Sequence, residues 1–280
     1  MIKMNYQECQ SFQSRIVLKL AVLCGLFLFA SCGQSLQNHL ERGEEFLAQR
    51  RFEEAAMQFR AATQIDDTSA KAHWGLARSL EAQGQFLETV EELRKVSDLA
   101  PENLEAKSKL GNYYLLFTPP QIQESEKILQ DIFKRDKNFI EGHILQASIF
   151  SAQNKSVKEI VDVLDKAISL DKKRTESYLA KSRFFMKINE AEKAEATIKE
   201  AIAVNDKKAL GYVEYGRFLT YADRGDESEA QFLKAIEVES KNIEARESLA
   251  NHYLTRRELE KAEKAYQDLA AVQNNSPESR

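Results

Sequence analysis

Apolar positions recur along this chain with two nested periods. Over short distances they fall three or four residues apart, which is the spacing of one face of an α-helix. Over longer distances the same residue types return, and such self-similarity predicts a stack of repeated units. A column of small residues shows the long period, with successive steps of 34, 34, 36, 35, 34 and 34 residues: Gly43, Ala77, Gly111, Ala147, Ser182, Gly216 and Ala250.

Three further columns keep this period over the same seven copies. They are Phe46, Leu80, Tyr114, Phe150, Phe185, Leu219 and Tyr253; then Phe59, Leu93, Leu129, Leu164, Ile198, Phe232 and Tyr266; then Ala62, Val96, Ile132, Ala167, Ala201, Ala235 and Leu269. Within each copy, two helix-period stretches are separated by a short polar turn such as residues 83–85. We therefore expect each copy to be a helical hairpin that buries its apolar faces only by stacking on its neighbours.

The second copy resembles the tetratricopeptide repeat family. It carries, in order, Trp74, Leu76, Ala77, Leu80, Gly84, Phe86, Leu93, Leu99 and Pro101. The resemblance implies an all-α fold, a right-handed superhelical α-solenoid of about seven tetratricopeptide hairpins after a cleaved signal peptide. The expected copies are residues 36–69, 70–103, 104–139, 140–174, 175–208, 209–242 and 243–276, followed by a tail over 277–280.

The third and fourth copies are longer than the others, and we place their extra residues in the hairpin turns. In the third copy the insertion lies in Phe117-Thr118-Pro119-Pro120-Gln121. Threonine is a favourable helix N-cap and proline is favourable in the first turn of a helix. The sequence therefore predicts that Thr118 caps a helix opened by Pro119 and Pro120.

Composition limits the chemistry that the chain can carry. Of 280 residues, 30% are charged and the formal net charge is −4, so no basic footprint for nucleic acid is present. All three cysteines lie in the first 32 residues, which leaves none for a disulfide framework in the body of the chain. The four histidines show no metal-binding spacing, and no phosphate-binding glycine loop occurs. We therefore expect no enzyme activity, no cofactor and no metal.

Residues 1–31 predict a targeting segment rather than part of the fold. Arg15 and Lys19 precede an apolar run over residues 20–30. That run has about half of the roughly 20 residues that a transmembrane helix needs. A transmembrane anchor and an ordinary secretory signal cleaved near Ser31 are the alternatives.

The end of the apolar run, Leu28-Phe29-Ala30-Ser31-Cys32-Gly33, resembles the lipobox of bacterial lipoproteins. The resemblance implies cleavage before Cys32, diacylglycerol on its thiol and acylation of its amino group. Residues 32–35 would then be the lipidated cysteine and a short linker. The resemblance implies that an Asp directly after the cysteine would be an inner-membrane retention signal. Gly33 stands there instead, which favours a protein anchored in the outer membrane and facing the periplasm.

The tetratricopeptide resemblance also implies a partner-binding groove, because in that fold the first helix of each hairpin lines the concave surface. The expected groove residues mix apolar anchors with arginine, and aromatic residues and arginine dominate interface energetics. They are Leu40, Leu47, Trp74, Arg78, Asn112, Leu115, Ile144, Leu179, Arg183, Met186, Val213, Arg217, Tyr221 and Asn251. For Leu40, Ile144 and Val213 the alternative is packing against neighbouring helices.

Together these features predict a non-catalytic scaffold or adaptor, held by lipid in the bacterial cell envelope. Its groove would bind a peptide or helix of a protein partner in a secretion, pilus or polysaccharide-export assembly. One alternative is a periplasmic binding subunit for carbohydrate or lipid, or an accessory subunit of an envelope enzyme. Another is a spacer without any groove-dependent partner.

Overall fold

The computed structural model describes residues 35–274, which are all-α and contain no strand. The predicted targeting segment, Cys32 and residues 275–280 lie outside the described residues. The chain divides into two compact units, Met1–Leu99 and Ala100–Arg280. Over residues 35–274 the helices follow one another as hairpins, which confirms the all-α helical-repeat fold that the sequence predicts.

The first unit holds four helices among its described residues. The first covers residues 35–48, and it is followed by α2 (Phe52–Ile65), α3 (Ala70–Ala82) and α4 (Phe86–Leu99). The ring of Phe59 is fully buried at the centre of this unit and lies against Gly43 and Gly75, where a Cβ atom would come within 2.6 Å and 2.2 Å of it. Glycine at these positions thus lets the helices approach the ring closely.

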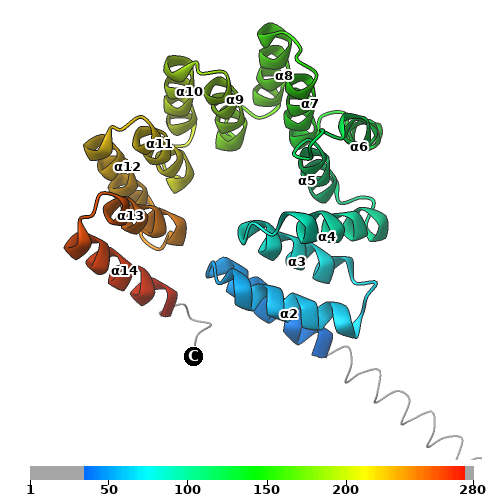
Figure 1. Cartoon of the computed structure of the whole chain (residues 1–280), viewed down its shortest axis with the longest axis horizontal. Helices are drawn as coiled ribbons and strands as arrows, with labels where there is room; N and C mark the ends of the chain where they lie inside the picture. The colour runs from blue at the N-terminus through cyan, green and yellow to red at the C-terminus, as the bar shows by residue number, and fades with distance from the viewer. Residues whose placement is uncertain (1–34, 275–280) are drawn as a thin grey trace, which may run out of the picture. The chain divides into compact units, whose positions relative to one another are not determined.

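The second unit continues the pattern with five hairpins. They are α5 (Leu104–Tyr114) with α6 (Ile122–Arg135), α7 (Ile140–Ala152) with α8 (Val157–Leu170), α9 (Thr175–Lys187) with α10 (Ala191–Val204), α11 (Ala209–Tyr221) with α12 (Gly225–Val238), and α13 (Ile243–Thr255) with α14 (Leu259–Asn274). The first helices of successive hairpins contact one another, from α5 through α13. Within this unit the odd-numbered helices therefore lie on the inner side of a curve and the even-numbered helices on its outer side (Figure 1).

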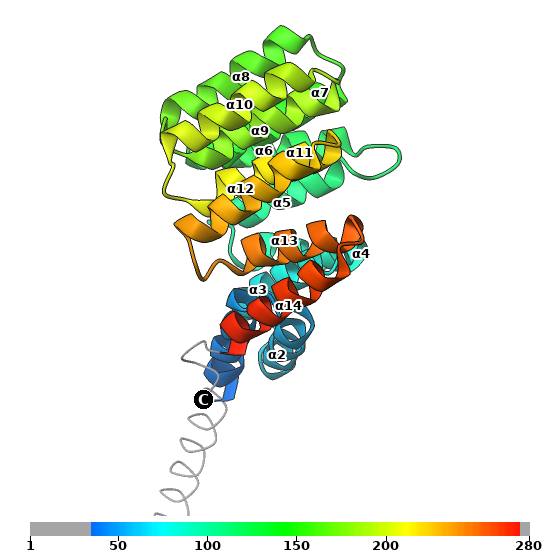
Figure 2. The ribbon, with the colours of Figure 1, turned by 90° about the vertical axis from the view of Figure 1, so that its left-hand side faces the viewer.

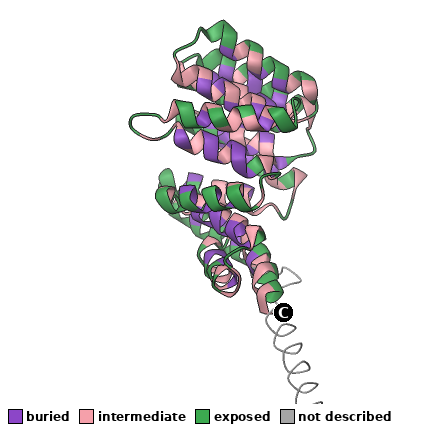
Figure 3. Cartoon of the chain, turned by 90° about the vertical axis from the view of Figure 1, so that its right-hand side faces the viewer, coloured by how far each residue is buried: buried purple, intermediate pink, exposed green. Residues whose placement is uncertain are grey.

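The repeated columns form the core, as the sequence predicts. Ala62, Val96, Ile132, Ala167, Ala201 and Ala235 are each 0% exposed. Figure 3 shows buried residues concentrated where helices pack against each other. Tyr266 departs from its column, because it is 39% exposed while its counterpart Phe232 is 2% exposed. Among the described residues no hairpin follows α14 to cover this position, and Tyr266 donates to Asn251 Oδ1 at 2.6 Å.

The connection between α5 and α6 differs in detail from the sequence expectation. Helix α6 begins at Ile122 with Gln121 as its N-cap, so Thr118 caps no helix. The reason is local, because Pro120 disfavours the α conformation of the residue before it and Pro119 therefore cannot start a helix. Both prolines lie in the connection over residues 115–121, which extends beyond the neighbouring turns (Figure 2).

A further repeated column, which the sequence did not suggest, consists of side chains that contact backbone carbonyl oxygens in the turns between hairpins. His73 Nε2 lies 2.9 Å from the Asp67 carbonyl oxygen, and Tyr178 Oη donates to the Lys172 carbonyl oxygen at 3.1 Å. The equivalent contacts, each six residues apart in sequence, are made by His143 to the carbonyl of Lys137 and by Arg246 to the carbonyl of Ser240. These histidines therefore stabilise the fold.

Candidate functional site

Two adjoining hollows open along the first helices of the second unit. The first hollow has a volume of about 440 Å³ and an apolar floor with a few polar groups. It is lined by Asn112, Leu115, Leu116, Ile144, Ala147, Ser148, Ser151, Ala152, Ile160, Leu164, Ala180, Arg183, Phe184 and Lys187. Its walls therefore come from α5 and the turn after it, α7, α8 and α9.

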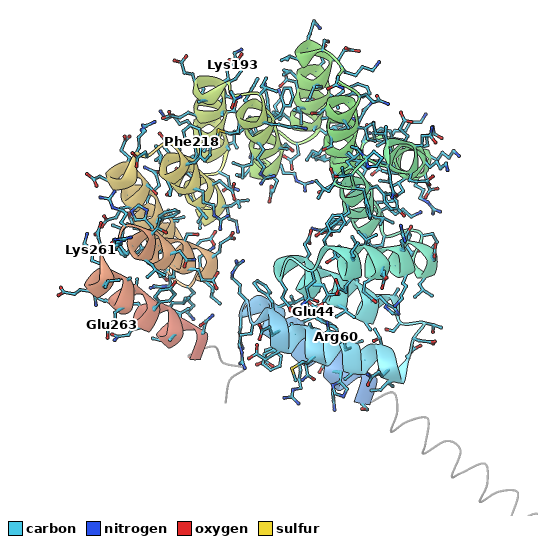
Figure 4. The ribbon with its side chains drawn as sticks, in the orientation of Figure 1. Glu44, Arg60, Lys193, Phe218, Lys261 and Glu263 are labelled. Atoms are coloured by element: carbon cyan, nitrogen blue, oxygen red, sulfur yellow. The ribbon has the colours of Figure 1, made fainter. Side chains whose placement is uncertain are left out.

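The second hollow has a volume of about 190 Å³ and lies between α9, α10 and α11. It is lined by Leu179, Ser182, Arg183, Met186, Ile198, Glu214, Arg217, Phe218 and Tyr221. Figure 4 places Phe218 on α11, while Lys193 and Lys261 lie on the outer helices α10 and α14. The apolar lining of this hollow comes from α9 and α11 and, through Ile198, from α10.

Arg183 is common to both hollows because of its place on α9. Residues 180, 184 and 187 face the first hollow, and residues 179, 182 and 186 face the second. Arg183 lies between these two helical stripes, at three- and four-residue steps from both. Its side chain is exposed, and within residues 35–274 no hydrogen bond or ion pair reaches its guanidinium group.

The other two predicted groove arginines are paired. Arg217 donates to Glu214 at 2.8 Å and to Glu244 of α13 at 2.8 Å. Burial alone would lower the pKa of Arg217, but hydrogen bonds and charge from these carboxylates raise it. In the first unit, Arg78 forms an ion pair with Glu44 and lies over the ring of Trp74 at 5.6 Å.

Two predicted groove residues are corrected by their burial. Leu179 is 2% exposed and Val213 is 1% exposed. Leu179 belongs to the core shared by α7–α11, and Val213 packs with Ala209 and alanines of α12 and α13. Side chains this buried support the floor of the surface, but they have almost no area left for a partner.

The remaining predicted residues fall into separate places. Asn112, Leu115 and Ile144 line the first hollow, while Met186 and the 78% exposed Tyr221 line the second. Leu40 and Leu47 are half-buried against the core cluster of the first unit. Asn251 accepts a hydrogen bond from Tyr266 at 2.6 Å and lines neither hollow.

The structure adds lining residues that the sequence did not suggest. Lys187 donates from Nζ to Ser151 Oγ at 2.8 Å, and the buried ring of Phe184 lines the same hollow. Lys187 follows Arg183 by four residues, so helical spacing alone would place both on one face. That this face of α9 points into the first hollow depends on how α9 packs against α7 and α8.

Residues 35–274 contain no group of three or more His, Cys, Asp and Glu side chains arranged to hold a metal ion. None of the helices in this part of the chain combines the length and apolar character that crossing a membrane requires.

Comparison with known proteins finds likeness in structure only. No protein-family model matches the chain, and no curated protein sequence matches it. Similar solved structures are a thermophilic tetratricopeptide-repeat protein of Thermus thermophilus, TTC0263 (20% identity, 78% of this chain and 99% of that chain covered, TM-score 0.46); PilF of Pseudomonas aeruginosa (17%, 79%, 99%, 0.48); and Cut9 in the APC/C hetero-tetramer Cut9–Hcn1 (12%, 78%, 42%, 0.52). The likeness is one of fold, an array of tetratricopeptide-type helical hairpins.

Proposed function

We propose that this chain, which folds as a tetratricopeptide-type array, is a non-catalytic scaffold in the bacterial envelope. A lipid on Cys32 anchors it, and the inner surface of α5, α7, α9 and α11 binds a protein partner. The partner belongs to a secretion, pilus or polysaccharide-export assembly. The observation that carries the binding role is Arg183, an unpaired cation between two apolar hollows.

Exposed apolar side chains beside the hollows support a protein partner. Leu116 is 66% exposed at the first hollow and Tyr221 is 78% exposed at the second. Aromatic and aliphatic groups that line an open surface supply the area a partner buries on binding. The surface extends over four helices, which suits a peptide or a helix better than a compact small molecule.

The proposed anchor would hold the array close to the membrane. In the part of the chain that the structure describes, the first helix begins at residue 35, three positions after Cys32. Two or three acyl chains give firm anchoring, since each buried methylene contributes roughly 0.8 kcal/mol. A binding surface held at this distance suits a partner that is itself part of a membrane assembly.

Metabolic labelling with an alkyne analogue of palmitate tests the anchor. Cys32→Ala should abolish labelling and release the chain from the membrane fraction. Cys24→Ala is the matched control and should be labelled like the unaltered chain. Labelling that persists in Cys32→Ala would refute lipidation at this residue.

Crosslinked co-purification from detergent-solubilised native membranes tests the scaffold role. We expect a defined partner to be captured by the unaltered chain and lost from the Arg183→Glu/Tyr221→Ala variant, since both residues line the second hollow. Arg60→Glu is the control, because Arg60 is an exposed residue of α2 and lines neither hollow. Capture of nothing specific by the unaltered chain would favour a spacer role.

A further inference from the structure

We infer that the surface around Arg183 binds an acidic amphipathic segment of the partner. One carboxylate of that segment meets Arg183, and an apolar side chain on each side of it enters one of the two hollows. This inference rests on the proposed function and adds the chemistry of the partner to it.

The charges of the first hollow select for an anion. Among the described residues, its charged lining side chains are Arg183 and Lys187, and no carboxylate lines it. Lys187 is held by the neutral hydroxyl of Ser151, so its charge is not compensated there. An incoming carboxylate gains attraction from both cations, whereas a basic segment would bring like charges together on an apolar floor.

In the second hollow, Arg183 is the cation that remains available to pair with a partner. Glu214 is the one carboxylate among the lining residues, and Arg217 holds it at 2.8 Å. Arg217 is also held by Glu244 and lies 3.3 Å from the Ser248 hydroxyl. The guanidinium group of Arg183 has all its donors free among the described residues, and its planar fork matches a carboxylate in two parallel hydrogen bonds.

The arrangement of α9 sets the order of groups in the occupant. The apolar wall of the first hollow includes Ala180 and Phe184, and that of the second includes Met186. Arg183 separates them, so a segment lying across α9 meets an apolar wall, a cation and a second apolar wall in turn. The complementary sequence has an acidic residue flanked on both sides by apolar residues.

Selection from a phage-displayed library of random 12-residue peptides tests this order. The bait is the full lipidated chain in detergent micelles, and selected peptides are measured by fluorescence anisotropy. We expect enriched peptides to carry Asp or Glu between apolar residues. Replacing that acid by its amide should weaken binding at least tenfold, because the pairing with Arg183 is lost.

Variants of the chain link the selected peptides to Arg183. Arg183→Glu should weaken binding at least tenfold, while Arg60→Glu should leave it within twofold. A peptide whose acid is replaced by Lys should regain at least a third of the original affinity for Arg183→Glu, since the two charges are then exchanged. Circular dichroism checks that both variants keep the helical fold.

Any of three results with the peptides would overturn the inference. The first is enrichment of basic or uncharged peptides, the second is binding that Arg183→Glu leaves unchanged, and the third is no enrichment at all. Decanoate binding that requires Arg183, without peptide binding, would assign the surface to a lipid anion instead. If native partner capture survives Arg183→Glu, this inference fails while the scaffold function stands; if the unaltered chain captures nothing specific, the scaffold function itself fails.

Discussion

Gly216 on α11 lies against the ring of Phe232 on α12, so closely that a Cβ atom on Gly216 would be 2.5 Å from Phe232 Cε1. Gly43 has the same relationship to Phe59 in the first unit. Two copies with alanine in the small column carry leucine in the other column: Ala77 with Leu93 and Ala147 with Leu164. In these four hairpins the sizes of the two columns compensate each other.

Replacing Gly216 by alanine should therefore destabilise the fold. Overpacking a tight core costs about 1–3 kcal/mol, and this outweighs the roughly 1 kcal/mol that alanine gains over glycine in helix propensity. Urea denaturation should show a lower midpoint for Gly216→Ala. The double variant Gly216→Ala/Phe232→Leu should recover part of the loss, and an unchanged midpoint for the single variant would contradict the packing argument.

A substitution of Arg257, in the turn between α13 and α14, should instead stabilise the fold. The φ of 61° at Arg257 is left-handed, a backbone conformation that is strained in residues other than glycine because their Cβ crowds the following carbonyl oxygen. The equivalent Gly84 has a φ of 71°. Left-handed backbone costs a residue with a Cβ about 1–2 kcal/mol, and the greater freedom of glycine in the unfolded chain offsets about 0.5–1 kcal/mol of this. Arg257→Gly should therefore stabilise the fold by about 0.5–1 kcal/mol, seen as a rise in Tm of a few degrees, whereas Gly84→Ala should lower Tm. A lower Tm for Arg257→Gly would show that the arginine side chain contributes more than its backbone strain removes.

The ion pair between Lys107 and Asp131 should respond unequally to loss of either partner. The Lys107 side chain is 9% exposed and that of Asp131 is 38% exposed. Asp131→Asn leaves a buried ammonium group without its counter-charge and should cost about 2 kcal/mol. Lys107→Met leaves a carboxylate that still contacts water and Arg135, so it should cost less than about 1 kcal/mol. Denaturation midpoints check the order, and equal losses would contradict it.

Glu195 should make stability depend on acid pH. Burial alone would raise its pKa, but hydrogen bonds from Lys199, Tyr215 and Arg224 lower it from 4.5 to about 2. A carboxyl group whose pKa is lower in the folded state stabilises the fold above its unfolded pKa. That contribution is then lost as pH falls from about 4.5 towards about 2.

The variant Glu195→Gln tests this pH dependence. We expect it to lower the free energy of unfolding at pH 7 by about 1–2 kcal/mol. It should also flatten the decline of Tm between pH 5 and 2 relative to the unaltered chain. Glu200→Gln is the matched control, because Glu200 is an exposed residue of the same helix. The same slope for Glu195→Gln and the unaltered chain would count against the assigned contacts.

The repeat and the core could be predicted from the periodicity of the chain. A period of about 34 residues with helical spacing inside each copy can bury its apolar faces only as stacked hairpins. The column that runs from Ala62 to Ala235 is accordingly buried. Local chemistry was less decisive at the third turn, where steric restriction by Pro120 outweighed the capping preference of Thr118.

Which groove arginine lacks a carboxylate partner could be seen only in the packed structure. Arg78, Arg183 and Arg217 occupy the same position of their copies, so the sequence predicts the same groove role for all three. Glu44 and Glu244 reach the first and the last of them from neighbouring helices, but no carboxylate reaches Arg183 within the described residues. An ion pair depends on what packing brings within about 4 Å, and residues 27–34 positions apart in the chain meet only through the stacking of hairpins.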